Sequence, residues 1–73
     1  MSSLPRVSGK KAVSVFEKAG WNIRGQVGSH IVLTKAGERV NLSVPQHKEL
    51  ATGMLRKLIR YSGLSVDEFT ALL

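Results

Sequence analysis

The sequence predicts an α+β fold: a two-layer α-β-β-β-α sandwich with a short helix added at the C-terminal end. Apolar residues recur at helical spacing before residue 20 and after residue 52, and they alternate with polar residues between positions 21 and 45. Each predicted strand is apolar on one parity only. We therefore expect one face of the sheet to pack against both main helices while the other face stays in water.

The chain is expected to form one domain over residues 1–73, because 73 residues can build only one small core. Residues 1–7 should be a loose lead-in, and residues 65–73 a helical extension. The sequence has no cysteine, which excludes disulfides and thiolate metal sites and favours a reducing cytoplasm. No apolar run is long enough to cross a membrane, and the start lacks the apolar core of a signal peptide, so neither insertion nor export is expected.

The first helix is predicted over residues 8–19. Ser8 is a suitable N-cap, and Val7 before it can pack against Ala12 as a hydrophobic staple. Gly20 should end the helix, since glycine adopts the left-handed conformation at little cost. The apolar side of this helix repeats at helical spacing: Ala12, Val13, Phe16 and Ala19.

Three strands are predicted between Trp21 and Pro45, with a bulge at Gly25 and a hairpin connection at residues 35–38. The core-facing parity consists of Trp21, Ile23, Val27, Ile31, Leu33, Val40, Leu42 and Val44. The opposite parity forms an open face, where we expect the function to lie: Asn22, Arg24, Gln26, His30, Thr34, Arg39, Asn41 and Ser43.

The second helix is predicted to start at a Thr52 cap and to end at Gly63. Its inner stripe is Leu55, Leu58, Ile59 and Ser62. Ser65 and Glu68 have the spacing of a capping box, which predicts a short last helix. The residues expected to anchor that helix to the core are Val66, Phe69 and Leu73.

The chain is strongly basic, with eleven Lys and Arg against five Asp and Glu, a net charge of +6. Such an excess attracts polyanions, and RNA, DNA and an acidic protein all fit it. Basic groups along a helix can hold an RNA backbone, although they can also be a solubilising face. Our candidate RNA-binding residues are Lys10, Lys11, Arg24, Arg39, His47, Lys48, Arg56, Lys57 and Arg60.

Gly28-Ser29-His30 occupies the predicted turn into the second strand. Because imidazoles titrate near neutral pH, a histidine here could take the proton of an RNA 2′-hydroxyl or give one to the departing 5′-oxygen. Lys and Arg would stabilise the phosphorane, and no metal is needed. The alternative interpretation is a surface histidine at a strand edge. A Ser29–His30 hydrolase pair is disfavoured, because neighbouring strand residues point to opposite faces.

Two further residues have open alternatives. His47, in the polar loop after Pro45, could complete an acid–base pair with His30 or contact phosphate, or it could be a solvated loop residue. Trp21 could stack on a base or fill the core, and its parity with Ile23 favours the core.

Five segments carry a resemblance to a known family: Ala19–Trp21, Gly28–His30, Val44–Leu50, Gly53–Ile59 and Ser62–Leu64. In this order and spacing, from about residue 8 to 65, the chain resembles the HicA toxins of bacterial type II toxin–antitoxin modules. The resemblance departs at Met54, where family members often have threonine, in a shorter basic run before His47, and in the tail after residue 65.

The resemblance implies a fold like a double-stranded-RNA-binding domain and an mRNA interferase that acts in the bacterial or archaeal cytoplasm. We expect no cofactor and no metal, because the RNA carries its own nucleophile. It implies that His30 is catalytic, with Gly28 and Ser29 as supporting residues. It also implies a HicB antitoxin as partner, through which alone the toxin would meet operator DNA.

Three hypotheses about function remain at this point. The first is a metal-independent endoribonuclease in which His30 is the general base or acid and Arg24, Lys48 and Arg56 contact phosphates. The second is a non-catalytic RNA-binding module on the same scaffold. The third is a protein-binding domain whose charge serves an acidic partner.

Overall fold

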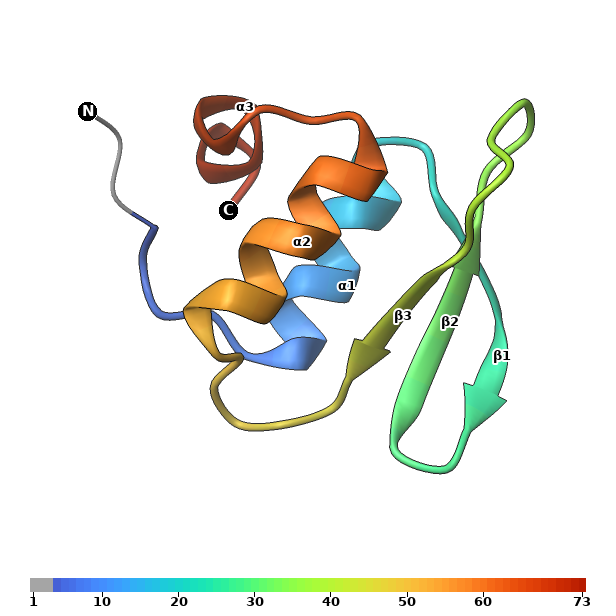
Figure 1. Cartoon of the computed structure of the whole chain (residues 1–73), viewed down its shortest axis with the longest axis horizontal. Helices are drawn as coiled ribbons and strands as arrows, with labels where there is room; N and C mark the ends of the chain where they lie inside the picture. The colour runs from blue at the N-terminus through green and yellow to red at the C-terminus, as the bar shows by residue number, and fades with distance from the viewer. Residues whose placement is uncertain (1–3) are drawn as a thin grey trace.

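A computed structural model describes residues 4–73; the first three residues of the predicted lead-in lie outside the described part. Within that part, a three-stranded antiparallel sheet in the order β1-β2-β3 has the helices on one side (Figure 1). The predicted α+β class and element order are confirmed. In chain order the elements are α1 (Gly9–Lys18), β1 (Asn22–Val27), β2 (His30–Thr34), β3 (Leu42–Pro45), α2 (Thr52–Ser62) and α3 (Val66–Ala71).

The core lies between the inner face of the sheet and the three helices. Trp21 is only 1% exposed, and its indole N–H donates to the Ser62 carbonyl oxygen at 3.4 Å, which ties the entry to β1 to the end of α2. The rings of Phe16 and Phe69 lie 5.5 Å apart, so α3 is anchored to α1. Trp21 is therefore a core residue, as its parity predicts, and Phe69 anchors the last helix.

The start of α1 is fixed by local chemistry and by a close approach to β3. Ser8 caps the helix by accepting the Lys11 backbone N–H at 3.0 Å, as predicted. Val7 is buried and its carbonyl accepts the Leu50 N–H at 2.8 Å, so the end of the predicted lead-in is packed rather than loose. A side chain at Gly9 would collide with the Pro45 carbonyl oxygen, which makes glycine necessary there.

The predicted burial of β1 is wrong. All six residues of this edge strand are exposed, including Ile23 at 50% and Val27 at 71%. The register shifts between Ile23 and Gly25, which confirms the predicted bulge. The extra residue reverses the parity beyond it: Gln26 pairs with Ile31, whose side chain faces the helices, and Val27 pairs with His30 on the open face.

Three smaller predictions are also wrong. The third strand begins at Leu42, and Val40 is exposed in the preceding loop with Arg39, because the β2–β3 connection is longer than a four-residue hairpin. Ala51, not Thr52, is the N-cap of α2, since it is Ala51 that has extended backbone angles. At the C-terminal end, Leu72 packs against the core in place of Leu73.

The remaining terminal signals behave as predicted. Gly63 ends α2 in the left-handed conformation with φ of 84°. Ser65 and Glu68 form the reciprocal capping box, with bonds of 2.8 and 3.0 Å. Within the described residues, no helix combines the length and the apolar character needed to span a membrane.

Candidate functional site

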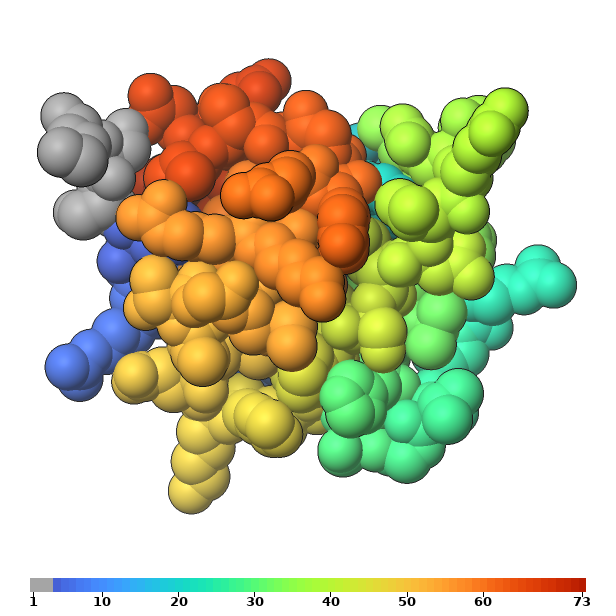
Figure 2. Space-filling view, viewed as in Figure 1, coloured from blue at the N-terminus to red at the C-terminus, as the bar shows by residue number. Residues whose placement is uncertain are grey.

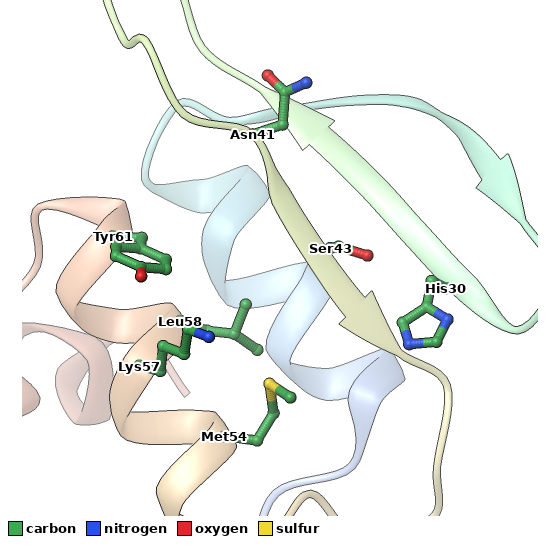
Figure 3. Close-up of a pocket in the computed structure, with 7 residues that line it drawn as sticks. All are labelled: His30, Asn41, Ser43, Met54, Lys57, Leu58 and Tyr61. Atoms are coloured by element: carbon green, nitrogen blue, oxygen red, sulfur yellow. The ribbon is translucent and has the colours of Figure 1, made fainter.

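A cavity of about 250 Å³ opens where the outer face of the sheet meets α2. Figure 3 shows its two walls, one from the strands and the loop before β3, the other from α2. In Figure 2, α2 (orange) and the β2–β3 region (green to yellow-green) lie next to each other on one face of the molecule. The lining residues are His30, Asn41, Ser43, Met54, Lys57, Leu58 and Tyr61.

His30 is the first residue of β2, and it is exposed. The turn before it is tight: Gly28 has a left-handed φ of 59°, which favours glycine, and its carbonyl accepts the Gln26 side-chain N–H at 3.0 Å. The Gln46 backbone N–H donates to the Ser29 carbonyl at 2.7 Å and joins this turn to the end of β3. The imidazole is thus presented on a segment that is held from two sides.

Strand pairing places His30 on the open face. Its partners across the sheet are Val27 and Pro45, while the neighbouring Ile31 pairs with Val44, which is buried under the helices. Because side chains alternate along a strand, His30 points away from the core. The exposed position predicted for this histidine is confirmed.

Lys57 is the predicted cationic residue that lines the cavity together with His30. It projects from α2, and its ammonium nitrogen lies 5.8 Å from the centre of the Tyr61 ring. Of the described residues in the lining, none is acidic. A phosphate group in this cavity would therefore meet an imidazole and an ammonium without a nearby carboxylate from the lining.

The other predicted basic residues lie outside this cavity. Lys10 lines a separate groove between α1 and the β1–β2 strands. Arg56 and Arg60 line a shallow hollow against the start of α3. The remaining candidates are exposed on α1, on β1 and in the two long loops: Lys11, Arg24, Arg39, His47 and Lys48. The structure therefore brings together His30 and Lys57, but not the wider predicted set.

Sequence reasoning missed several residues of the cavity. Asn41 and Ser43 belong to the predicted open face, but no signal in the sequence assigns them or Met54 a role in the site. Met54, Leu58 and Tyr61 are spaced four and three residues apart, which places them on one face of a helix. The spacing indicates that the three side chains share one face of α2. It does not show that β3 lies opposite this face.

The arrangement can bind a phosphodiester and move a proton beside it. An imidazole can accept or donate a proton near neutral pH, and a lysine ammonium can stabilise negative charge on phosphate oxygens. Both groups are exposed, so a long, flexible substrate could reach them.

Comparison with known proteins gives a consistent result. Residues 9–64 match the family model described as the HicA toxin of bacterial toxin–antitoxin. The chain is similar to a structure described as a toxin–antitoxin complex from Streptococcus pneumoniae, with 34% identity, a TM-score of 0.69, and coverage of 78% of this chain and 97% of that one. It is also similar to a HicA3 and HicB3 toxin–antitoxin complex, at 28% identity and a TM-score of 0.66, covering 81% and 97%. No curated protein sequence matches the chain.

Proposed function

This chain belongs to the HicA family of toxins from bacterial toxin–antitoxin systems, and we propose that it is an endoribonuclease that cuts mRNA and so blocks translation. The observation that carries the proposal is the shared cavity of His30 and Lys57 on the open side of the sheet. Family membership supports a toxin, and the cavity offers an imidazole and an ammonium that RNA cleavage can use.

In the proposed reaction, the RNA supplies its own nucleophile. The 2′-hydroxyl loses its proton to a general base, and its oxygen attacks the adjacent phosphorus. The bond from phosphorus to the 5′-oxygen then breaks, and that oxygen takes a proton from a general acid. The products are a 2′,3′-cyclic phosphate and a free 5′-hydroxyl. His30 serves as the base or as the acid, and Lys57 stabilises the negative charge of the phosphorane.

This reaction does not require a metal ion, because the attacking oxygen belongs to the substrate and need not be made from water. We expect cleavage to continue in excess EDTA. Loss of cleavage in the chelator, restored by adding a divalent cation, would contradict the metal-independent mechanism.

We also propose that a HicB-type antitoxin binds and neutralises this protein in the cytoplasm, where mRNA is found. The two structures compared above are toxin–antitoxin complexes, and the present chain covers 97% of each matched chain. A net charge of +6 favours an acidic partner. Co-expression with the product of the adjacent reading frame should give a complex that co-purifies and no longer cleaves RNA.

The test of the nuclease proposal compares the two histidines of the chain. His30→Ala should abolish cleavage of labelled single-stranded mRNA and the growth arrest caused by expression. His47→Ala removes the imidazole of the β3–α2 loop, outside the cavity, and should keep the cleavage rate at saturating RNA. Both positions are exposed, so the free energy of unfolding should change by less than about 0.5 kcal/mol.

Full cleavage by folded His30→Ala protein would refute the assignment of His30. If the wild-type protein binds RNA with a strong dependence on salt but yields no cyclic-phosphate ends, the chain is instead a non-catalytic RNA-binding module.

A further inference from the structure

The proposed cleavage reaction leaves one wall of the cavity unexplained. His30 is assigned one of the two proton transfers and Lys57 the phosphate, yet the same cavity is also lined by Asn41, Ser43, Met54, Leu58 and Tyr61. Figure 3 shows the α2 members across the cavity from the strand residues. The wall combines an aromatic ring, a thioether, an amide and a hydroxyl, which is a different chemistry from phosphate binding.

Two large apolar side chains of this wall are exposed to solvent. Met54 is 38% exposed and Tyr61 is 43% exposed, whereas Leu58 between them is buried in the core. Their position on the cavity side of α2 therefore leaves a flat ring and a polarisable sulfur available to a ligand. Every nucleobase has a π-face, so any of the bases can stack on such a ring.

The polar groups of the wall suit the edge of a base. An asparagine amide carries both hydrogen-bond donors and an acceptor, and a serine hydroxyl can act in either role. Asn41 and Ser43 are both exposed at the β3 side of the cavity. They can therefore pair with the mixed donor and acceptor pattern of a base edge.

The cavity has a volume of about 250 Å³ and is open to solvent. A single base can be placed with its ring in this hollow and its sugar and phosphate outside. A base can enter only if it has left its own stack, as in a single-stranded loop or end.

We propose that this cavity is a subsite for one unstacked nucleobase of single-stranded RNA, next to the phosphodiester at His30. Tyr61 stacks on the base, Met54 contacts it, and Asn41 and Ser43 hydrogen-bond its edge. The Lys57 ammonium lies 5.8 Å from the Tyr61 ring centre, at the outer limit of a cation–π contact. A stacking base can displace the ammonium from the ring, and the ammonium is then placed to contact the phosphate of the same nucleotide. The subsite rests on the proposed function, because it names the substrate for the same site.

The first experiment measures binding without cleavage. The probe is a short single-stranded oligonucleotide with 2′-deoxy sugars, which lacks the nucleophile, and the reference is an abasic strand of the same length. Tyr61→Leu should weaken binding of the probe by about 5- to 150-fold, the effect of losing one base–aromatic stack. Tyr61→Phe should keep the affinity within about twofold, because the ring is retained. Leu73→Ala, an exposed apolar residue outside the cavity, is the matched control.

The abasic strand separates stacking from a structural effect. Tyr61→Leu should leave its affinity unchanged, because there is no base to stack. An equal loss of affinity for the probe and the abasic strand would overturn the subsite, because the effect of Tyr61→Leu would then come from charge or folding. Unchanged affinity of Tyr61→Leu for the probe would overturn it as well.

A second measurement uses the single tyrosine of the sequence. In protein labelled at the tyrosine ring, the ring proton resonances should shift upfield on titration with the probe and not with the abasic strand. Asn41→Ala should reduce the difference in affinity between oligo-U, oligo-C and oligo-A probes. The absence of a shift in the Tyr61 ring resonances would contradict the stacking contact. An unchanged base preference in Asn41→Ala would contradict the hydrogen bond from Asn41.

The two proposals can fail separately. If Tyr61→Leu loses base-dependent binding while the wild-type protein cleaves nothing, the subsite stands and the nuclease proposal fails. If cleavage depends on His30 but Tyr61→Leu binds and cleaves normally, the nuclease stands and the subsite fails.

Discussion

At the scale of single residues, the surroundings decide what each side chain can do. Trp21 and Tyr61 are both amphipathic aromatics, yet Trp21 is buried with its N–H bonded to the Ser62 carbonyl, while Tyr61 lies exposed in the cavity. Likewise Arg56 and Lys57 are neighbours in sequence, but only the lysine lines the cavity of His30, because consecutive residues project about 100° apart around a helix.

This difference predicts distinct kinetics for the two basic residues. Lys57→Ala should lower the cleavage rate at saturating RNA by about 10²-fold, the usual effect of removing one group that stabilises an anionic transition state. Lys57→Arg should restore much of the rate, since it keeps the charge. Arg56→Ala should raise KM and leave kcat nearly unchanged. Single-turnover and steady-state cleavage of one RNA substrate would measure kcat and KM for both variants. A loss of kcat in Arg56→Ala but not in Lys57→Ala would contradict the role assigned to Lys57.

At the scale of elements, the contacts between segments override local preference. Gly9 begins α1, where alanine would normally be the better helix residue, but a Cβ there would collide with the Pro45 carbonyl. The Gly9 N–H also donates to the His47 carbonyl at 2.9 Å. The start of α1 thus packs directly against Pro45 at the end of β3, the residue that pairs with His30 across the sheet.

The two helical glycines should therefore respond in opposite directions. Gly9→Ala should lower the free energy of unfolding by about 1–3 kcal/mol, because the added methyl group overpacks a rigid backbone contact. In the first turn of α2, Gly53→Ala should raise the free energy of unfolding by up to about 1 kcal/mol, since no described atom beyond the local helix backbone lies within 4 Å of the new Cβ. Urea denaturation followed by Trp21 fluorescence would measure both, and stabilisation by Gly9→Ala would show that the contact is not close.

The bulge in β1 is a second effect at this scale. One extra residue between Ile23 and Gly25 moves Gln26 to the helix-facing side and Val27 to the open face beside His30. The edge strand then has no buried residue, although its sequence alternates like a half-buried strand.

At the scale of the whole molecule, the positive charge is spread over several faces. The cavity, the α1 groove and the α3 hollow each contain Lys or Arg: Lys57, Lys10, Arg56 and Arg60. A net charge of +6 attracts RNA from any direction, while the cavity determines where chemistry can occur. Affinity should therefore depend on basic residues of all three surfaces, whereas catalysis should depend on those of the cavity.

This separation predicts how salt acts on the protein. The logarithm of the RNA association constant should fall linearly with the logarithm of salt concentration, with a slope of about −0.7 for each phosphate contacted on a single strand. Arg56→Ala and Lys57→Ala should each make the slope shallower by about 0.7 if each residue contacts one phosphate. Fluorescence anisotropy on the uncleavable probe would measure the slopes, and binding independent of salt would contradict the electrostatic interpretation.

Much of the fold could be predicted, because its signals are local. The Ser8 cap, the left-handed Gly63 and the Ser65–Glu68 capping box each depend on residues within one or two turns. The inner stripe of α2 is buried as its spacing predicts. Predictions failed where contacts with a distant segment determined the structure. The burial of β1 depended on whether the helices reach that edge of the sheet. The N-cap of α2 depended on the residue at which the preceding loop becomes helical.

The sequence by itself determined the order of the elements, the apolar stripes that form the core, and the turn that presents His30, because periodicity, capping and glycine conformation act over short distances. Only the tertiary structure decided that α2 would lie beside the edge strand β3, where one side of the helix borders the open face of the sheet. That packing set Lys57 and Tyr61 across from His30, Asn41 and Ser43. The residues on the two walls are far apart in the chain, and no local preference relates them. The cavity therefore exists only once the core has fixed the helix against the sheet.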